Sequence, residues 1–191
     1  AHYGKIGAES PYFVNARMQM ARIYGMLQEY SQGLGVLRET LDAGKDQGEI
    51  YLMMASLYES MGDYEKAIRV AHEGLKRHKE DVALRFQLGV LLDKKGDKEA
   101  CIQQMQKVLE MDPDHADALN YIGYTYAEQG IRLEKALELI QKALRLRPDS
   151  GYIMDSLGWV YFQKGLYDKA VQHLEKAAKL THDDPTIHEH L

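Results

Sequence analysis

The chain repeats one pattern of residues about every 34 positions. For example, Gly158 is followed by Tyr161, and the same pair stands one period earlier as Gly123 and Tyr126. A fixed period of this length is typical of a solenoid, in which each unit packs against its neighbours. Such a fold directs the search for function toward an extended concave surface rather than toward a buried catalytic pocket.

We number each repeat so that its small first-helix residue is position 8. The chain then reads as a single solenoid domain over residues 1–191, with one inserted residue in the turn of the fourth repeat. Residues 1–13 fit the tail of a preceding repeat and residues 185–191 fit the start of a following one, so we expect a longer array. The five repeats cover 14–47, 48–81, 82–115, 116–150 and 151–184.

Each repeat is predicted to form two helices. Apolar residues at positions 4, 7, 8 and 11 and again at 17, 20, 24 and 27 have helical spacing, and in the second to fifth repeats a turn glycine at position 15 separates them. Small residues at positions 8 and 20 are expected where the two helices approach most closely. We expect tyrosines at positions 11 and 17 to fill the core around them: Tyr24, Tyr58, Tyr126, Tyr161, Tyr30, Tyr64 and Tyr167.

This pattern resembles the tetratricopeptide repeat (TPR). The third, fourth and fifth repeats match most of its signature, whereas the first two depart from it, for example with Arg17 in place of the aromatic at position 4. The resemblance implies an all-α fold, a right-handed superhelical solenoid of antiparallel helix pairs, and binding of proteins or peptides. Residues 120–177 also resemble long bacterial TPR proteins, which implies the periplasm or an outer-membrane lipoprotein as the location; a cytoplasmic location is the alternative.

A helical wheel defines the candidate binding surface. Positions 2, 5, 9, 12 and 13 lie opposite the apolar stripe of the first helix, and the resemblance implies that this side lines the concave groove. The candidate groove residues are Met18, Arg22, Leu52, Ser56, Glu59, Phe86, Val90, Asp93, Asn120, Tyr124, Glu128, Asp155, Trp159 and Phe162.

Aromatic residues on this side carry the functional hypothesis. Trp159 is the single tryptophan and stands at position 9, with Phe162 one turn later and Tyr124 at the same position of the fourth repeat. Such residues mark an interaction site when they are exposed; the alternative is packing against groove neighbours. Asn120 has both a donor and an acceptor for a peptide backbone.

Acidic residues interleave with the aromatic residues of this surface. Asp117, Glu128 and Asp155 are expected either to receive basic groups of a partner or to form an ordinary solvated surface. We therefore expect a mainly apolar peptide or helix with basic flanks as the partner. No repeat combines Lys at position 5 with Asn at position 9, the pair that TPR clamps use for acidic C-termini of heat-shock chaperones.

The composition and motifs of the chain argue against several classes of function. A net charge of −5 and the absence of a basic cluster argue against nucleic-acid binding, and no apolar run is long enough to insert into a membrane. Cys101 reads as a small buried residue. The sequence contains no cofactor, nucleophile or phosphate-binding motif, and His188 and His190 are badly spaced on a helix for one metal ion. We therefore expect no enzyme, cofactor or metal site.

Three functions stay open at this stage. The first is an adaptor that captures a peptide or helix in its groove. The second is a structural or oligomerisation module of a larger protein, and the third is a segment that regulates an attached enzyme. Val171, Leu174 and Ala178 of the last helix are expected to be exposed, which predicts end-to-end contacts between copies at high concentration.

Overall fold

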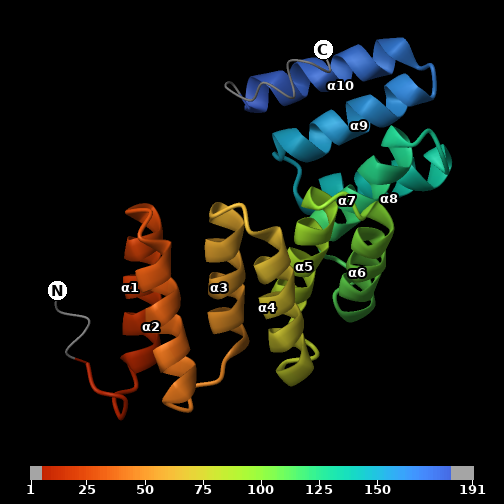
Figure 1. Cartoon of the computed structure of the whole chain (residues 1–191). Coiled ribbons are helices and arrows are strands. Elements are labelled where there is room, and N and C mark those ends of the chain that lie inside the picture. Colours follow the sequence, from red (N-terminus) through yellow and green to blue (C-terminus); the bar gives the residue numbers. More distant parts are fainter. Residues whose placement is uncertain (1–5, 182–191) are drawn as a thin grey trace. The chain divides into compact units, whose positions relative to one another are not determined.

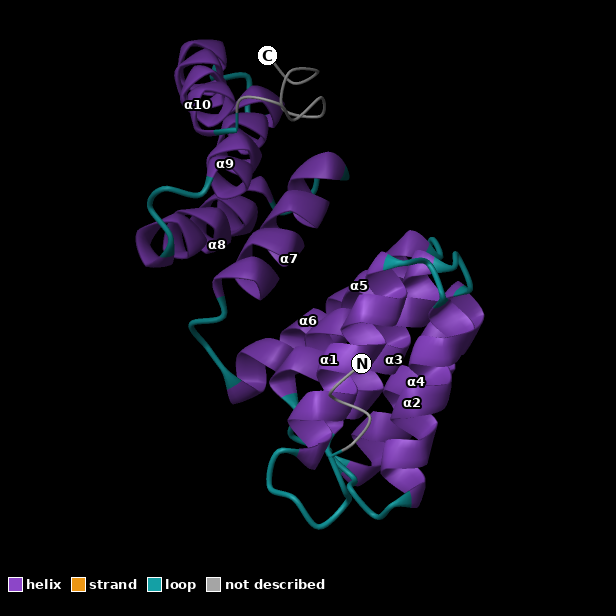
Figure 2. Ribbon diagram, turned by 90° about the vertical axis from the view of Figure 1, so that its left-hand side faces the viewer, coloured by secondary structure: helices purple, strands orange, loops and turns teal. Residues whose placement is uncertain are grey.

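A computed structural model describes residues 6–181 of the chain (Figure 1). These residues form five consecutive helix pairs joined by turns, and Figure 2 shows helices and loops without a strand among them. The all-α repeat fold is thereby confirmed. The helices are α1 (Phe13–Met26), α2 (Tyr30–Asp42), α3 (Gly48–Ser60), α4 (Tyr64–Arg77), α5 (Val82–Lys94), α6 (Lys98–Met111), α7 (Ala116–Glu128), α8 (Leu133–Leu146), α9 (Gly151–Gln163) and α10 (Tyr167–Leu180).

The turn inside each pair requires a left-handed backbone residue. Gly62, Gly96, Gly130 and Gly165 have φ values between 66° and 89°, which glycine adopts without steric penalty. The helix then ends in a Schellman-type turn, in which the backbone N–H two residues beyond the helix reaches back to its last turn. In the first repeat the same place is taken by Gln28, at a φ of 61°.

Small residues hold the two helices of a pair close together, as the spacing predicts. A β-carbon added to Gly123 of α7 would lie 3.1 Å from the carbonyl oxygen of Ala136 in α8. Gly158 of α9 stands in the same relation to Ala170 of α10, at 3.3 Å. Positions 8 and 20 therefore meet at the helix crossing, and a large side chain there would separate the helices.

The tyrosine prediction holds for six of the seven residues and fails for one. Tyr58, Tyr126 and Tyr161 are buried, and Tyr24, Tyr30 and Tyr64 are half-buried. Tyr167 is 62% exposed, so its assignment to the core was wrong. It is the first residue of α10, and its ring packs edge-on against Phe162 with 5.6 Å between centroids, on the outside of the helix pair.

The chain divides into two compact units, residues 1–104 and residues 105–191, with the division inside α6. In the first unit the first helices of the repeats, α1, α3 and α5, pack in sequence, while α2 and α4 each pack against the helix that follows. In the second unit α7 packs against both α8 and α9, and α10 packs against α9. Within each unit the first helices of successive repeats thus form a continuous layer.

Several expectations concern the ends of the chain. The partial repeat at residues 185–191 and the histidine-rich segment at 182–190 lie outside the described residues, as do residues 1–5.

Among residues 6–181, no cluster of three His, Cys, Asp or Glu side chains is arranged to hold a metal ion. Leu174 is 3% exposed because it packs onto Gly158, so its predicted exposure was wrong. None of the described helices has the length and apolarity needed to cross a bilayer.

Candidate peptide-binding surface

Three aromatic side chains cluster in the second unit, at the junction of α9 and α10. Trp159 and Phe162 stack with 5.2 Å between ring centroids and 18° between planes, and Phe162 contacts Tyr167. Trp159 is half-buried, whereas Phe162 remains 45% exposed. We call Trp159, Phe162 and Tyr167 the aromatic face. Its rings hold one another in place, so a ligand would meet a surface that is already ordered.

Asn120 lies at position 5 of α7, the helix that packs against α9. Its side-chain oxygen Oδ1 is buried, and no donor of the described part of the chain reaches it. An unsatisfied buried acceptor destabilises a fold by about 1–3 kcal/mol. The oxygen and nitrogen of a carboxamide are assigned from their surroundings, so either an acceptor or a donor can stand at this place.

The acidic candidates of this unit differ from their expected role. Asp155 is 6% exposed, so it belongs to the interior instead of to a solvated surface. Asp117 forms an ion pair with Arg147, 2.7 Å from Oδ1 to Nη1. Asp155 is therefore not displayed to receive a basic group, and Asp117 already pairs with a basic group of its own chain, which reduces the support for basic flanks. Glu128 is exposed, and Tyr124 is half-buried.

In the first unit three of the eight predicted groove residues contribute to the packing of the repeats. Met18 and Leu52 pack against the main hydrophobic core. Glu59 accepts hydrogen bonds from Gln87 Nε2, at 2.6 Å, and from Lys94 Nζ, at 2.5 Å, and so connects α3 to α5. The bond to Glu59 raises the pKa of Lys94. Ser56, Phe86, Val90 and Asp93 are half-buried, and Arg22 is exposed.

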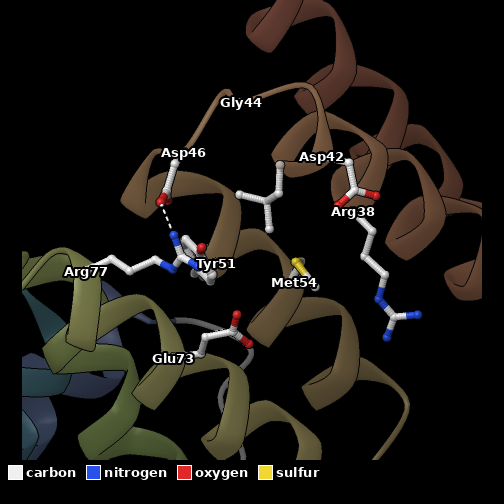
Figure 3. Close-up of a pocket in the computed structure, with 9 residues that line it drawn as sticks. Arg38, Asp42, Gly44, Asp46, Tyr51, Met54, Glu73 and Arg77 are labelled. Carbon is white, nitrogen blue, oxygen red and sulfur yellow. Dashed lines mark hydrogen bonds and ion pairs between the residues drawn. The ribbon is translucent and has the colours of Figure 1, made fainter.

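A pocket that the sequence did not predict lies between α2, α3 and α4, with a volume of about 460 Å³ (Figure 3). Asp46, in the loop after α2, accepts hydrogen bonds from Arg77 at 2.8 Å and makes a 2.9 Å contact with His78. The contact with His78 lowers the pKa of Asp46, and Arg77 and Tyr51 lower it further. Burial raises the pKa of Tyr51 to about 12, with a contribution from the nearby Asp46 carboxylate.

Among the charged groups that line this pocket, Asp46 and Arg77 satisfy each other. Asp46 is held by Arg77, and Arg38 directs its guanidinium away from Asp46 (Figure 3) and donates to the hydroxyl of Tyr58 at 2.5 Å. The pocket combines Tyr51 and Met54 of α3 with residues of α2, α4 and a connecting loop, and a helical wheel of the first helices does not show what those other elements contribute. Its interactions explain how the loop is fixed to α4 and do not by themselves define a ligand.

The stacked helix pairs define a helical-repeat protein of the class that serves as a scaffold for protein interactions. Three models of the tetratricopeptide repeat match the chain, at residues 48–91, 82–115 and 114–181. Together they cover four of the five helix pairs, and the chain belongs to the TPR family. A search of the curated proteins gave no match.

Solved TPR structures share the fold over almost the whole chain. A MamA protein superposes with a TM-score of 0.70 at 22% identity, covering 90% of this chain and 93% of that one. YrrB, described as a TPR protein with an unusual peptide-binding site, gives 0.70 at 19% identity, covering 99% and 97%. MamA from Desulfovibrio magneticus RS-1 gives 0.68 at 22%, covering 88% and 97%. At these identities the likeness concerns the fold.

Proposed function

We propose that this chain is an adaptor that binds an extended, mainly apolar peptide segment of a partner protein, without catalysis, on the α7–α9 layer of its second unit. The TPR fold supports a protein-interaction scaffold, and YrrB is a TPR protein of similar structure whose description includes peptide binding. The observation that carries the proposal is the aromatic face, where Phe162 stays 45% exposed although it stacks on Trp159. Exposed, ordered aromatic residues supply much of the binding energy of interfaces.

Asn120 favours an extended peptide over a helix. Its buried Oδ1 lacks a donor within residues 6–181, and a ligand that supplies an N–H group would remove that deficit. The backbone N–H groups inside a helix already donate to its own carbonyl groups. An extended segment has free N–H groups along its length, so it can place an apolar side chain on the aromatic face and donate to Asn120.

The test begins with selection of binding peptides from a displayed random library by the full chain. Affinities of selected peptides are then measured for Phe162→Ala, Trp159→Ala and Asn120→Ala. We expect the Phe162 and Trp159 substitutions to weaken binding by about 30-fold or more, as for hot-spot residues. Leu146→Ala is the matched control, because Leu146 is a 41% exposed apolar residue of the same unit outside the proposed site.

The binding mode has its own measurement. N-methylation of single peptide residues removes one backbone donor at a time, and at one position it should weaken binding to the wild type but not to Asn120→Ala. Binding that improves when the peptide is constrained to a helix would contradict the extended mode. Equal affinities of Phe162→Ala and the wild type, with circular dichroism showing both folded, would overturn the site.

The bacterial envelope is part of this proposal as the location of the adaptor. It rests on the resemblance of residues 120–177 to long bacterial TPR proteins. Fractionation of cells that express the full-length gene product, with immunodetection of this chain, tests it.

A further inference from the structure

Position 4 of the repeat carries an arginine in the first and third repeats, as Arg17 and Arg85. Arg17 pairs with the carboxylate of Glu39, at position 26 of the same repeat, and the Arg17 side chain is only 13% exposed. Arg85 donates to the side-chain oxygen of Gln104 in α6 at 3.3 Å and to the carbonyl oxygen of Lys79 at 2.7 Å. In both repeats the chain's own guanidinium therefore lies against the second helix of the repeat.

The second repeat lacks this arginine, because its position-4 residue is Tyr51. The position-26 carboxylate is nevertheless present as Glu73, an exposed residue of α4 that makes no hydrogen bond or ion pair within residues 6–181. Tyr51 acts instead on Asp46, whose pKa its hydroxyl lowers. Glu73 thus lacks the guanidinium that its counterpart Glu39 binds in the first repeat.

The space beside Glu73 is the pocket of about 460 Å³ between α2, α3 and α4. Leu41 of α2 and Met54 of α3 supply apolar surface to its lining. Asp42 of α2 adds a second carboxylate, which likewise makes no hydrogen bond or ion pair in the described part of the chain. Figure 3 shows Met54 and Tyr51 of α3 between Glu73 and Asp42. The pocket therefore combines an apolar wall with two carboxylates from different helices.

Neither arginine that lines the pocket forms an ion pair with these two carboxylates. Arg77 is bound by Asp46 at 2.8 Å, and Arg38 donates to a tyrosine hydroxyl of the same unit at 2.5 Å. Since Asp46 and Arg77 neutralise each other, Asp42 and Glu73 leave the pocket with unpaired negative charge. Carboxylates beside apolar surface suit a cation on a long apolar stem, whose methylene groups cover the apolar part while its charged end reaches the carboxylates.

We propose that this pocket binds an arginine side chain of a partner protein, with the guanidinium at Glu73 and Asp42 and the methylene groups against Leu41 and Met54. A guanidinium is planar and carries five N–H donors, so it can donate to two carboxylates at once, whereas a lysine ammonium is a point charge. The partner's arginine supplies to the second repeat the interaction that Arg17 supplies inside the first.

The pocket lies away from the predicted groove. Tyr51 and Met54 stand at positions 4 and 7 of the second repeat, whereas the groove was assigned to positions 2, 5, 9, 12 and 13. The pocket also belongs to the first unit, while the aromatic face belongs to the second. An arginine bound here does not occupy the aromatic face, so the two proposals can fail separately.

The test is an NMR titration of the ¹⁵N-labelled full chain with the capped tripeptide acetyl-Gly-Arg-Gly-amide, at constant ionic strength because salt screens charge. We expect saturable shifts at millimolar peptide, centred on the backbone amides of residues 41–54 and 73–77. The same peptide with citrulline, which has the shape of arginine without its charge, should leave these amides unshifted. The lysine peptide should bind at least about threefold more weakly than the arginine peptide, because it cannot donate to both carboxylates.

Substitutions of the two carboxylates locate the site. Glu73→Gln and Asp42→Asn should each weaken binding of the arginine peptide about two- to fivefold, as for a partly exposed ion pair. Glu49→Gln is the matched control, because Glu49 is an exposed acidic residue of α3 at position 2, on the side away from the pocket. This variant should bind the arginine peptide like the wild type.

Tyr51→Arg tests the comparison between repeats. It places the chain's own guanidinium at position 4, as in the first and third repeats, so the arginine peptide should no longer shift the amides around the pocket. The dispersion of the amide spectrum shows whether this variant is folded. If the loss of the buried tyrosine unfolds it, the exposed substitution Glu73→Gln decides the question.

Several results would overturn the proposal. The first is the absence of saturable shifts around the pocket. The second is a citrulline or lysine peptide that binds as tightly as the arginine peptide, which would exclude a guanidinium site. The third is an unchanged affinity in Glu73→Gln, or in a folded Tyr51→Arg variant. None of these results would affect the peptide site of the second unit, since the titration reads the amides of the first unit.

Discussion

Gly123 of α7 lies so close to Ile140 of α8 that a β-carbon on the glycine would stand 2.6 Å from Ile140 Cγ1. The carbonyl oxygen of Ala136 closes the other side of this space. Gly35 in α2 has the opposite surroundings, since no heavy atom of the described residues lies within 4 Å of the corresponding point. The fold thus contains helical glycines that packing requires and one that it does not.

Alanine substitution should separate these two cases. We expect Gly123→Ala to destabilise the protein by about 1–3 kcal/mol through overpacking against Ile140. Gly35→Ala should stabilise it by up to about 1 kcal/mol, because alanine is the better helix former and nothing opposes its methyl group. Urea unfolding of both variants measures the two changes. A Gly123→Ala protein as stable as the wild type would mean that α7 and α8 can move apart freely.

Gln28 offers a stabilising substitution. It has a φ of 61° at the place where the other four repeats use glycine, and a left-handed conformation disfavours a residue with a β-carbon by about 1–2 kcal/mol. Gln28→Gly should therefore raise the free energy of unfolding by about 1 kcal/mol. Gly62→Gln, the reverse change in the second repeat, should lower it by a similar amount. Thermal unfolding of the Gln28→Gly and Gly62→Gln variants measures both effects. If the two substitutions changed the free energy of unfolding in the same direction, the explanation would be wrong.

The helix pairs and their turns could be predicted from the sequence because spacing alone determines them. Gly123 and Gly158 stand at position 8 of their repeats, and the structure places them at the helix crossings. The left-handed turn at Gln28 could also be located, although no glycine marks it, since the repeat register fixes its position. Periodic features of this kind recur in every repeat and therefore confirm one another.

The depth of the candidate site residues could not be predicted in the same way. A helical wheel gives the direction of a side chain from its own helix axis, but burial depends on what a neighbouring helix places over it. Asp155 and Glu59 were expected on an open surface, yet Asp155 is buried and Glu59 is engaged by Gln87 and Lys94. The Asp46 cluster was missed because it joins a loop of one repeat to the second helix of the next, without a periodic signal.

Asp46 makes stability depend on pH on the acid side. Its pKa is lowered in the folded protein by His78 and then by Arg77 and Tyr51. The stabilisation is therefore present above the unfolded pKa, about 4, and is lost as pH falls through the lower folded pKa. We expect Asp46→Asn to lose less stability than the wild type on acidification. The difference should stay below about 1 kcal/mol because the pair is partly exposed.

Urea unfolding between neutral pH and about pH 3 measures this difference. Asp42→Asn is the control, because Asp42 lines the same pocket but does not contact Arg77 or His78 in any hydrogen bond or ion pair of the described residues. If Asp46→Asn and the wild type lose the same free energy of unfolding on acidification, then the contacts of Asp46 with His78 and Arg77 do not stabilise the fold.

Tyr51 makes the stability of the fold depend on pH on the alkaline side. Its side chain is 2% exposed, and burial followed by the Asp46 carboxylate raises its pKa to about 12. Because the folded state retains the phenolic proton more strongly than the unfolded state, the stabilisation is complete below the unfolded pKa of about 10. It is lost as pH rises toward the folded pKa. Tyr51→Phe keeps the ring and removes the proton, so its stability should fall less between about pH 10 and about pH 11.5.

At neutral pH the same variant should be less stable than the wild type, because it lacks the phenol that helps to lower the pKa of Asp46. The stability curves of the two proteins should therefore approach each other as pH rises. Tyr12→Phe is the matched control, since Tyr12 is a 68% exposed tyrosine outside this cluster. If the free energy of unfolding falls equally with rising pH in Tyr51→Phe and in the wild type, while Tyr12→Phe also behaves like the wild type, then Asp46 and burial do not hold the proton on Tyr51.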